Sequence, residues 1–98
     1  MLFAVFFEDK PEASEIRKKT LIDHIQWLEQ HKDLILVGGS LREHPSSDPL
    51  GGLWLVEAES KETVTRLIHT DPFWIEGLRK SFRILHWSKA FPHLKTLV

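Results

Sequence analysis

Three short runs of the sequence are apolar at both even and odd positions, and this double pattern constrains the fold more than any other feature. The runs are LFAVFFE at residues 2–8, DLILVGGSL at 33–41 and GGLWLVEA at 51–58. Successive side chains of a strand point to opposite faces of its sheet, so a strand that is apolar throughout needs cover on both faces. The runs therefore predict a sheet that is buried on both sides.

Two segments have the composition and spacing of helices. Residues 12–31 contain few helix breakers, and Leu21, Ile25 and Leu28 recur at helical spacing, so we expect them to form a core-facing stripe. Ser60 is the expected N-cap of a second helix. The buried stripe of that helix is expected to consist of Val64, Leu67 and Ile68.

A fourth strand, LRKSFRILHW at residues 78–87, completes the order β-α-β-β-α-β. This order predicts an α+β, ferredoxin-like fold, with a four-stranded antiparallel sheet and two main helices on one of its faces. A chain of 98 residues can build one core but not two. We therefore expect residues 1–98 to form a single domain.

The second face of this sheet leads to a prediction about assembly. Two helices cover only one face of a four-stranded sheet, so the other apolar face would be left in water. We expect a homodimer in which the open faces of two sheets pack together. The alternative is that the C-terminal segment, KAFPHLKTLV at residues 89–98, folds over the open face of its own sheet.

Composition excludes several classes of partner and site. The 13 basic and 14 acidic residues give a net charge of −1, so we expect no nucleic-acid partner. The first apolar run meets charged residues at positions 8–10, too early for a signal peptide or a membrane span, so we expect no membrane partner and a cytoplasmic location. The absence of cysteine excludes a disulfide framework, a thiolate nucleophile and a cysteine-based metal site.

His24 and Asp71 are the two candidates for acid–base chemistry. His24 falls at the edge of the predicted buried stripe, where a partly desolvated imidazole can act as a general base. Considered alone, it is explained more simply as a boundary histidine that hydrogen-bonds a carbonyl. Asp71 precedes Pro72 and suits the N-cap of a short helical turn that ends at Gly77. Capping is compatible with a second role, in which the carboxylate orients an imidazole.

The remaining candidates carry weaker signals. Phe73 and Trp74 are expected to line a pocket beside the acidic residue that precedes them. Ser40 follows a glycine pair but lacks the surroundings of a nucleophile elbow. No histidine spacing typical of a metal site occurs, so we expect no metal and no cofactor; a site assembled in space from His24 and His86 is the alternative.

Over nearly its whole length the chain resembles the YCII-related family (YciI-like proteins), small members of the dimeric α+β barrel group. The segments that carry the resemblance are MLFAVFFEDK, HIQWLEQ, ILVGGSL, GGLWLVEAES and above all TDPFWIEGL. The resemblance implies a dimer with a pocket in each subunit and a His–Asp dyad that matches His24 and Asp71. It also places Ser40 near the presumed pocket as a substrate-binding candidate, at a position where many relatives have proline.

The function implied is that of a cofactor-independent enzyme. Its dyad would perform general acid–base chemistry, of the elimination or isomerisation type, on a small cyclic or aromatic substrate. One branch of the family is associated with dehydrochlorination of a chlorinated hydroxyhydroquinone. Two alternatives stay open: a non-enzymatic dimeric module that binds a small ligand or has an accessory role, and a cofactor-free monooxygenase or haem-handling protein. The four tryptophans and His86 suggest the latter.

Overall fold

The computed structural model describes residues 1–95, which form one antiparallel sheet and three helices. The elements in chain order are β1 (Leu2–Asp9), α1 (Ser14–Gln30), β2 (Ile35–Leu41), β3 (Gly51–Glu57), α2 (Lys61–Thr70), α3 (Pro72–Ile75) and β4 (Arg79–His86). The strand order in the sheet is β2-β3-β1-β4. The predicted α+β fold with a ferredoxin-like order of elements is confirmed.

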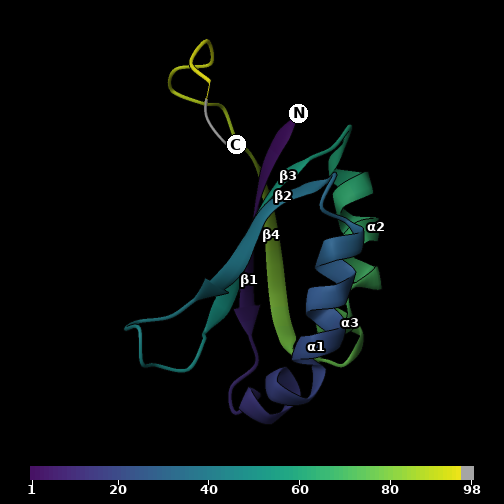
Figure 1. Cartoon of the computed structure of the whole chain (residues 1–98), viewed down its shortest axis with the longest axis vertical. Coiled ribbons are helices and arrows are strands. Elements are labelled where there is room, and N and C mark those ends of the chain that lie inside the picture. Colours follow the sequence, from purple (N-terminus) through teal and green to yellow (C-terminus); the bar gives the residue numbers. More distant parts are fainter. Residues whose placement is uncertain (96–98) are drawn as a thin grey trace.

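The helices all lie on one face of the sheet (Figure 1). On this face the cross-strand pairs Phe3–Val56 and Val5–Trp54 bring buried side chains of β1 and β3 together. Residues from α1 and α2 close the core above them. Within residues 1–95, no helix has the length and apolar character that are needed to cross a membrane.

Local capping signals position α2 and α3. The Ser60 hydroxyl accepts a hydrogen bond from the backbone N–H of Thr63, as predicted for an N-cap. The predicted stripe of Val64, Leu67 and Ile68 is buried. The short helix α3 starts with proline at its first position and is followed by Gly77 at φ 81°, a left-handed backbone that glycine adopts at low cost.

The buried face of α1 differs from the predicted one. Leu21 and Ile25 are 43% and 53% exposed, so the predicted stripe was wrong, although Leu28 does pack against the core. Apolar residues occur on two sides of this helix, and the side that meets the sheet contains polar groups. The buried residues of α1 are Thr20, His24 and Trp27.

The other face of the sheet stays largely open. Phe6 of β1 is 43% exposed and Val37 of β2 is 49% exposed. The C-terminal segment leaves the body beyond β4 (Figure 1), and its Phe91 and Leu94 are themselves exposed. As far as residue 95, this segment reaches only one end of the open face, where it lines a cavity with Leu2 and Leu55, and it leaves Phe6 and Val37 exposed. Residues 96–98, the rest of the expected covering segment, lie outside the described residues.

Candidate functional site

His24 and Asp71 form a buried pair between α1 and the junction of α2 with α3. The Nδ1 of His24 lies 2.7 Å from Oδ1 of Asp71, and the two side chains are only 7% and 1% exposed. The same Oδ1 accepts a hydrogen bond of 3.0 Å from the backbone N–H of Phe73, so Asp71 also caps α3 as predicted. One carboxylate therefore fixes both the helix turn and the imidazole.

The imidazole is held by packing as well as by this hydrogen bond. The His24 ring stacks on Phe73 with centroids 3.8 Å apart and planes 10° from parallel. On its own helix it lies nearly parallel to Trp27, with centroids 6.4 Å apart. Because the rings and the carboxylate together restrict its rotation, the imidazole has a defined orientation. It lies well inside the buried face of α1, deeper than the edge position predicted for it.

The hydrogen bond to Asp71 determines what the other ring nitrogen can do. An ionised carboxylate only accepts hydrogen bonds, so Nδ1 of His24 carries a proton and Nε2 is the basic atom of the neutral ring. The structure gives Nε2 no partner among residues 1–95. In this part of the chain, Nε of Arg79 is the one side-chain nitrogen or oxygen that is both fully buried and unpartnered. The Nε2 of His24 is therefore not fully enclosed, and it has no hydrogen-bond partner in this part of the chain.

A second buried charge cluster adjoins this pair. Oδ1 of Asp9 accepts from Nη1 of Arg79 at 2.7 Å, and Oδ2 accepts from Nη2 of Arg17 at 2.6 Å. Both guanidinium carbons lie 5.1 Å from the centroid of the Phe73 ring. Burial lowers the pKa of Arg79, while the hydrogen bond and charge of Asp9 act in the opposite direction.

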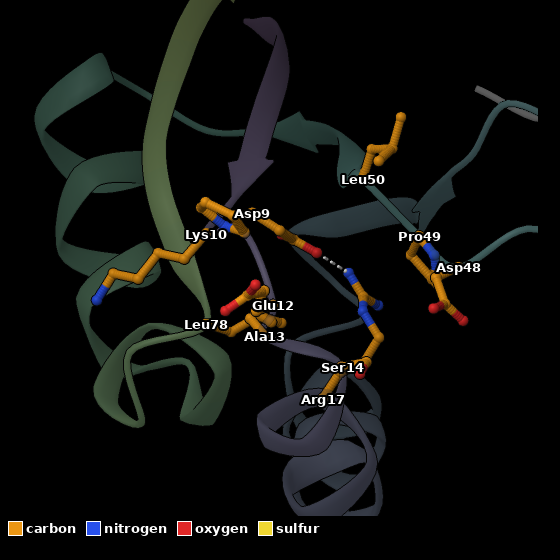
Figure 2. A pocket seen from close by; sticks show the side chains of 11 residues that line it. Asp9, Lys10, Glu12, Ala13, Ser14, Arg17, Asp48, Pro49, Leu50 and Leu78 are labelled. Atoms are coloured by element: carbon orange, nitrogen blue, oxygen red, sulfur yellow. Dashed lines mark hydrogen bonds and ion pairs between the residues drawn. The ribbon is translucent and has the colours of Figure 1, made fainter.

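A cavity of about 200 Å³ lies beside the Asp9–Arg17 pair (Figure 2). It is bounded by the N-terminal end of α1, the segment that follows β1 and the loop between β2 and β3. In Figure 2 the Arg17 guanidinium lies between Asp9 and the loop residues Asp48 and Pro49. Neither residue of the buried His–Asp pair lines this cavity.

A family model, the YCII-related domain, matches residues 1–88 of this chain. The chain belongs to the YCII-related family. This membership agrees with the resemblance that the TDPFWIEGL segment carries. A comparison with curated proteins found no match.

Two solved structures show where this YCII-related chain lies among known folds. The first is the 5-chloro-2-hydroxyhydroquinone dehydrochlorinase TftG from Burkholderia phenoliruptrix, in complex with 2,5-dihydroxybenzoquinone. It has 29% sequence identity and a TM-score of 0.82, over 90% of this chain and 94% of that one. The second, a protein from Agrobacterium tumefaciens, has 14% identity and a TM-score of 0.50, over 92% of this chain and 96% of that one, and supports the fold alone.

The other predicted site residues have different surroundings in this YCII-related structure. Phe73 lies against the His24 ring, as described above. Trp74 instead packs against His69 and Phe82, with ring centroids 5.3 Å away in each case. Ser40 is exposed on β2, where its hydroxyl accepts a hydrogen bond of 2.7 Å from Arg42. The structure thus brings Phe73, but neither Trp74 nor Ser40, into contact with the His–Asp pair.

His86, considered above as a metal ligand together with His24, is the last residue of β4. Its ring packs against Phe3, with centroids 4.7 Å apart. Among residues 1–95 there is no group of three or more histidine, aspartate or glutamate side chains placed to hold a metal ion.

Sequence reasoning missed the cluster of Asp9, Arg17 and Arg79. One signal was available, because Arg17 is seven residues before His24 and therefore lies on the same side of α1. The other two residues are 70 positions apart and meet only when the first and last strands pair. Charged residues at strand ends are usually solvated, so nothing in the sequence marked Asp9 and Arg79 as a buried pair.

Proposed function

We propose that this YCII-related protein is a cofactor-independent enzyme in which His24 is the general base and Asp71 orients it. The observation that carries the proposal is the buried hydrogen bond between them, which leaves Nε2 of His24 as the basic and unpartnered nitrogen. A carboxylate on the far side of an imidazole also stabilises the imidazolium that forms when the ring takes a proton. The pair thus has the arrangement that general acid–base catalysis needs.

The reaction class follows from what a single base can do. Nε2 of His24 takes a proton from a ring carbon next to a carbonyl, and the C–H electron pair moves toward the carbonyl oxygen to give an enolate. The enolate then expels a neighbouring group with its electron pair, or takes the proton back at another carbon. The first outcome is an elimination and the second is an isomerisation.

The similar dehydrochlorinase supports a substrate of this kind. That protein is named for removing the elements of hydrogen chloride from a chlorinated hydroxyhydroquinone, and its structure holds a dihydroxybenzoquinone. We therefore assign this chain a small, oxygenated, six-membered ring as its substrate class. Phe73, stacked on the imidazole, would hold the base in place while such a ring reacts.

The test is to incubate the protein with 5-chloro-2-hydroxyhydroquinone and related ring compounds, and to measure chloride release and exchange of ring protons with deuterated solvent. His24→Gln should lower the rate of any activity by roughly 10²- to 10⁴-fold, the usual contribution of a positioned base. His31→Gln is the matched control, because His31 is the C-cap of the same helix and its ring bonds the Trp27 carbonyl rather than a carboxylate. Its activity should remain near that of the wild type.

Two outcomes would contradict the proposal. One is activity that survives in His24→Gln at the wild-type rate. The other is a wild-type protein that binds these rings but neither releases chloride nor exchanges their protons. The second outcome would favour the alternative of a ligand-binding module.

We also propose that the protein is a homodimer built through the open sheet face. The exposed side chains of Phe6, Val37 and Leu41 lie on one face of the sheet by their strand register, opposite the buried face that packs against the helices. Burying them against a second copy removes this apolar surface from water. Sedimentation velocity at micromolar concentration should give the mass of a dimer, and Phe6→Glu should shift it toward a monomer. A wild-type monomer under these conditions would refute the proposal.

A further inference from the structure

Arg79 is the most unusual buried group in the described chain. Its side chain is 3% exposed, and of its five N–H donors only one at Nη1 has a partner, the carboxylate of Asp9. The Nε is fully buried with no partner, and Nη2 has none among residues 1–95. Native proteins rarely bury a donor in this way, because an unpaired buried donor costs its full desolvation energy.

The charges around Arg79 leave this cation only partly compensated. Asp9 is shared, since its second oxygen binds Arg17, so two guanidinium groups face one carboxylate. The next carboxylate that acts on Arg79 is Asp71, but its Oδ1 already accepts from His24 and from the backbone of Phe73. The cluster of Asp9, Arg17 and Arg79 therefore carries an excess of positive charge.

The donors without partners are also the ones suited to bind an anion. In a guanidinium group, Nε and the Nη trans to Cδ present two parallel N–H bonds, the fork that takes a carboxylate bidentately. A Cβ added at Gly52 would lie 3.2 Å from Nη2 and 3.4 Å from Nη1, so a glycine at this position lets the guanidinium pack closely against β3. The guanidinium also lies over Phe7 at 4.4 Å, which fixes the plane of the fork.

We infer that the Nε–Nη2 fork of Arg79 is an anion-binding subsite that takes two adjacent oxygens of an ionised ring ligand. An ionised hydroxyl next to a carbonyl, which is a vinylogous carboxylate, presents such a pair of oxygens. The ligand class of this subsite rests on the proposed function. It is taken from that function because Arg79 and His24 both pack on the Phe73 ring. Charge that develops on a ring oxygen when the base removes a proton is then stabilised by the guanidinium.

The test uses 2,5-dihydroxybenzoquinone as the probe and 2,5-dimethoxybenzoquinone as the matched compound that cannot ionise. Calorimetric titration of the wild type should show tighter binding of the dihydroxy compound. Arg79→Gln should weaken binding of that compound by about 10- to 100-fold, the value of a hydrogen bond to a charged group, and should leave the dimethoxy compound unaffected. Arg66→Gln is the control variant, since it removes an exposed guanidinium of α2 that lies outside this cluster; it should change both affinities by less than about threefold.

A second measurement observes ligand binding at Arg79 in the wild-type protein itself. The buried Nε–H of Arg79 should give its own ¹⁵N–¹H signal in the wild type, identified by its loss in Arg79→Lys. Saturation with the dihydroxy compound should shift this signal, and the dimethoxy compound should not. If the Nε–H signal does not shift while the probe is bound, the Nε–H of Arg79 does not contact the probe, and the inference is overturned. Equal affinities in the wild type and Arg79→Gln, or no saturable binding at all, overturn it as well.

These outcomes separate the subsite from the catalytic proposal. His24→Gln should keep its affinity for the probe while it loses proton exchange. If the wild type binds through Arg79 but exchanges no protons, the anion subsite stands and the catalytic role of His24 fails. If proton exchange is present, but Arg79→Gln keeps the wild-type affinity and the probe does not shift the Nε–H signal, the catalytic role stands and the subsite fails.

Discussion

Asp9 and Asp71 are both buried carboxylates with cationic or basic partners, yet they are built for different tasks. Asp9 joins two guanidinium groups, which stay charged throughout the accessible pH range. Asp71 joins an imidazole, a group that can take up and release a proton, and a backbone N–H. A pair of permanent charges can hold strands and helices together, whereas a pair with one exchangeable proton can also perform chemistry.

Among variants of the two carboxylates, Asp9→Asn is expected to cause the largest loss of folding stability. The substitution leaves the largely buried guanidinium groups of Arg17 and Arg79 without a counter-charge, and breaking a buried pair costs about 3–5 kcal/mol. Urea unfolding at a fixed protein concentration should show a loss of this size. Asp48→Asn, an exposed acid on the rim of the same cavity, should stay within about 0.5 kcal/mol of the wild type. A variant Asp9→Asn as stable as Asp48→Asn would remove the structural role assigned to Asp9.

A smaller loss of stability is expected from Asp71→Asn, with a separate effect on activity. The amide oxygen of asparagine can still accept from Phe73 and from Nδ1 of His24, so the free energy of unfolding should fall by only about 0.5–2 kcal/mol. The charge that stabilises the imidazolium is lost, so any activity should fall by about 10- to 100-fold. Unfolding and rate measurements on one preparation would check both. If Asp71→Asn proves as destabilising as Asp9→Asn with its activity intact, the distinction between the two carboxylates fails.

The sheet, the helices and the two residues of the buried pair could all be predicted from the sequence, but each for a different reason. Strands 2–8 and 51–58 were visible because their apolar residues are local and continuous. The cap at Asp71 was visible because the proline after it restricts the backbone. That Asp71 touches His24 required the family resemblance, because nothing in either segment encodes a contact across 47 residues.

Other features could not be predicted because they depend on partners from distant segments. Leu21 and Ile25 looked like the core stripe of α1 because apolar character is the usual marker of burial. The helix instead buries Thr20, which a pattern of hydrophobicity assigns to the surface, and His24, which that pattern placed only at the edge of the stripe. Nothing in the sequence indicated that Arg79 is buried, because a buried arginine is stable only with a carboxylate partner, and its partner Asp9 comes from a distant segment.

The position of β1 in the sheet has a consequence for the order in which the protein can form. β1 precedes the other strands of this sheet in the chain, and both of its neighbours, β3 and β4, follow only after α1. Pairings between such distant segments require large loops to close, which makes them slow steps of folding. The pairing of Asp9 with Arg79 across 70 residues must therefore wait until the last strand has left the ribosome. A nascent chain that ends before β4 already contains His24 and Asp71, but it lacks Arg79 and therefore cannot assemble the charged cluster beside them.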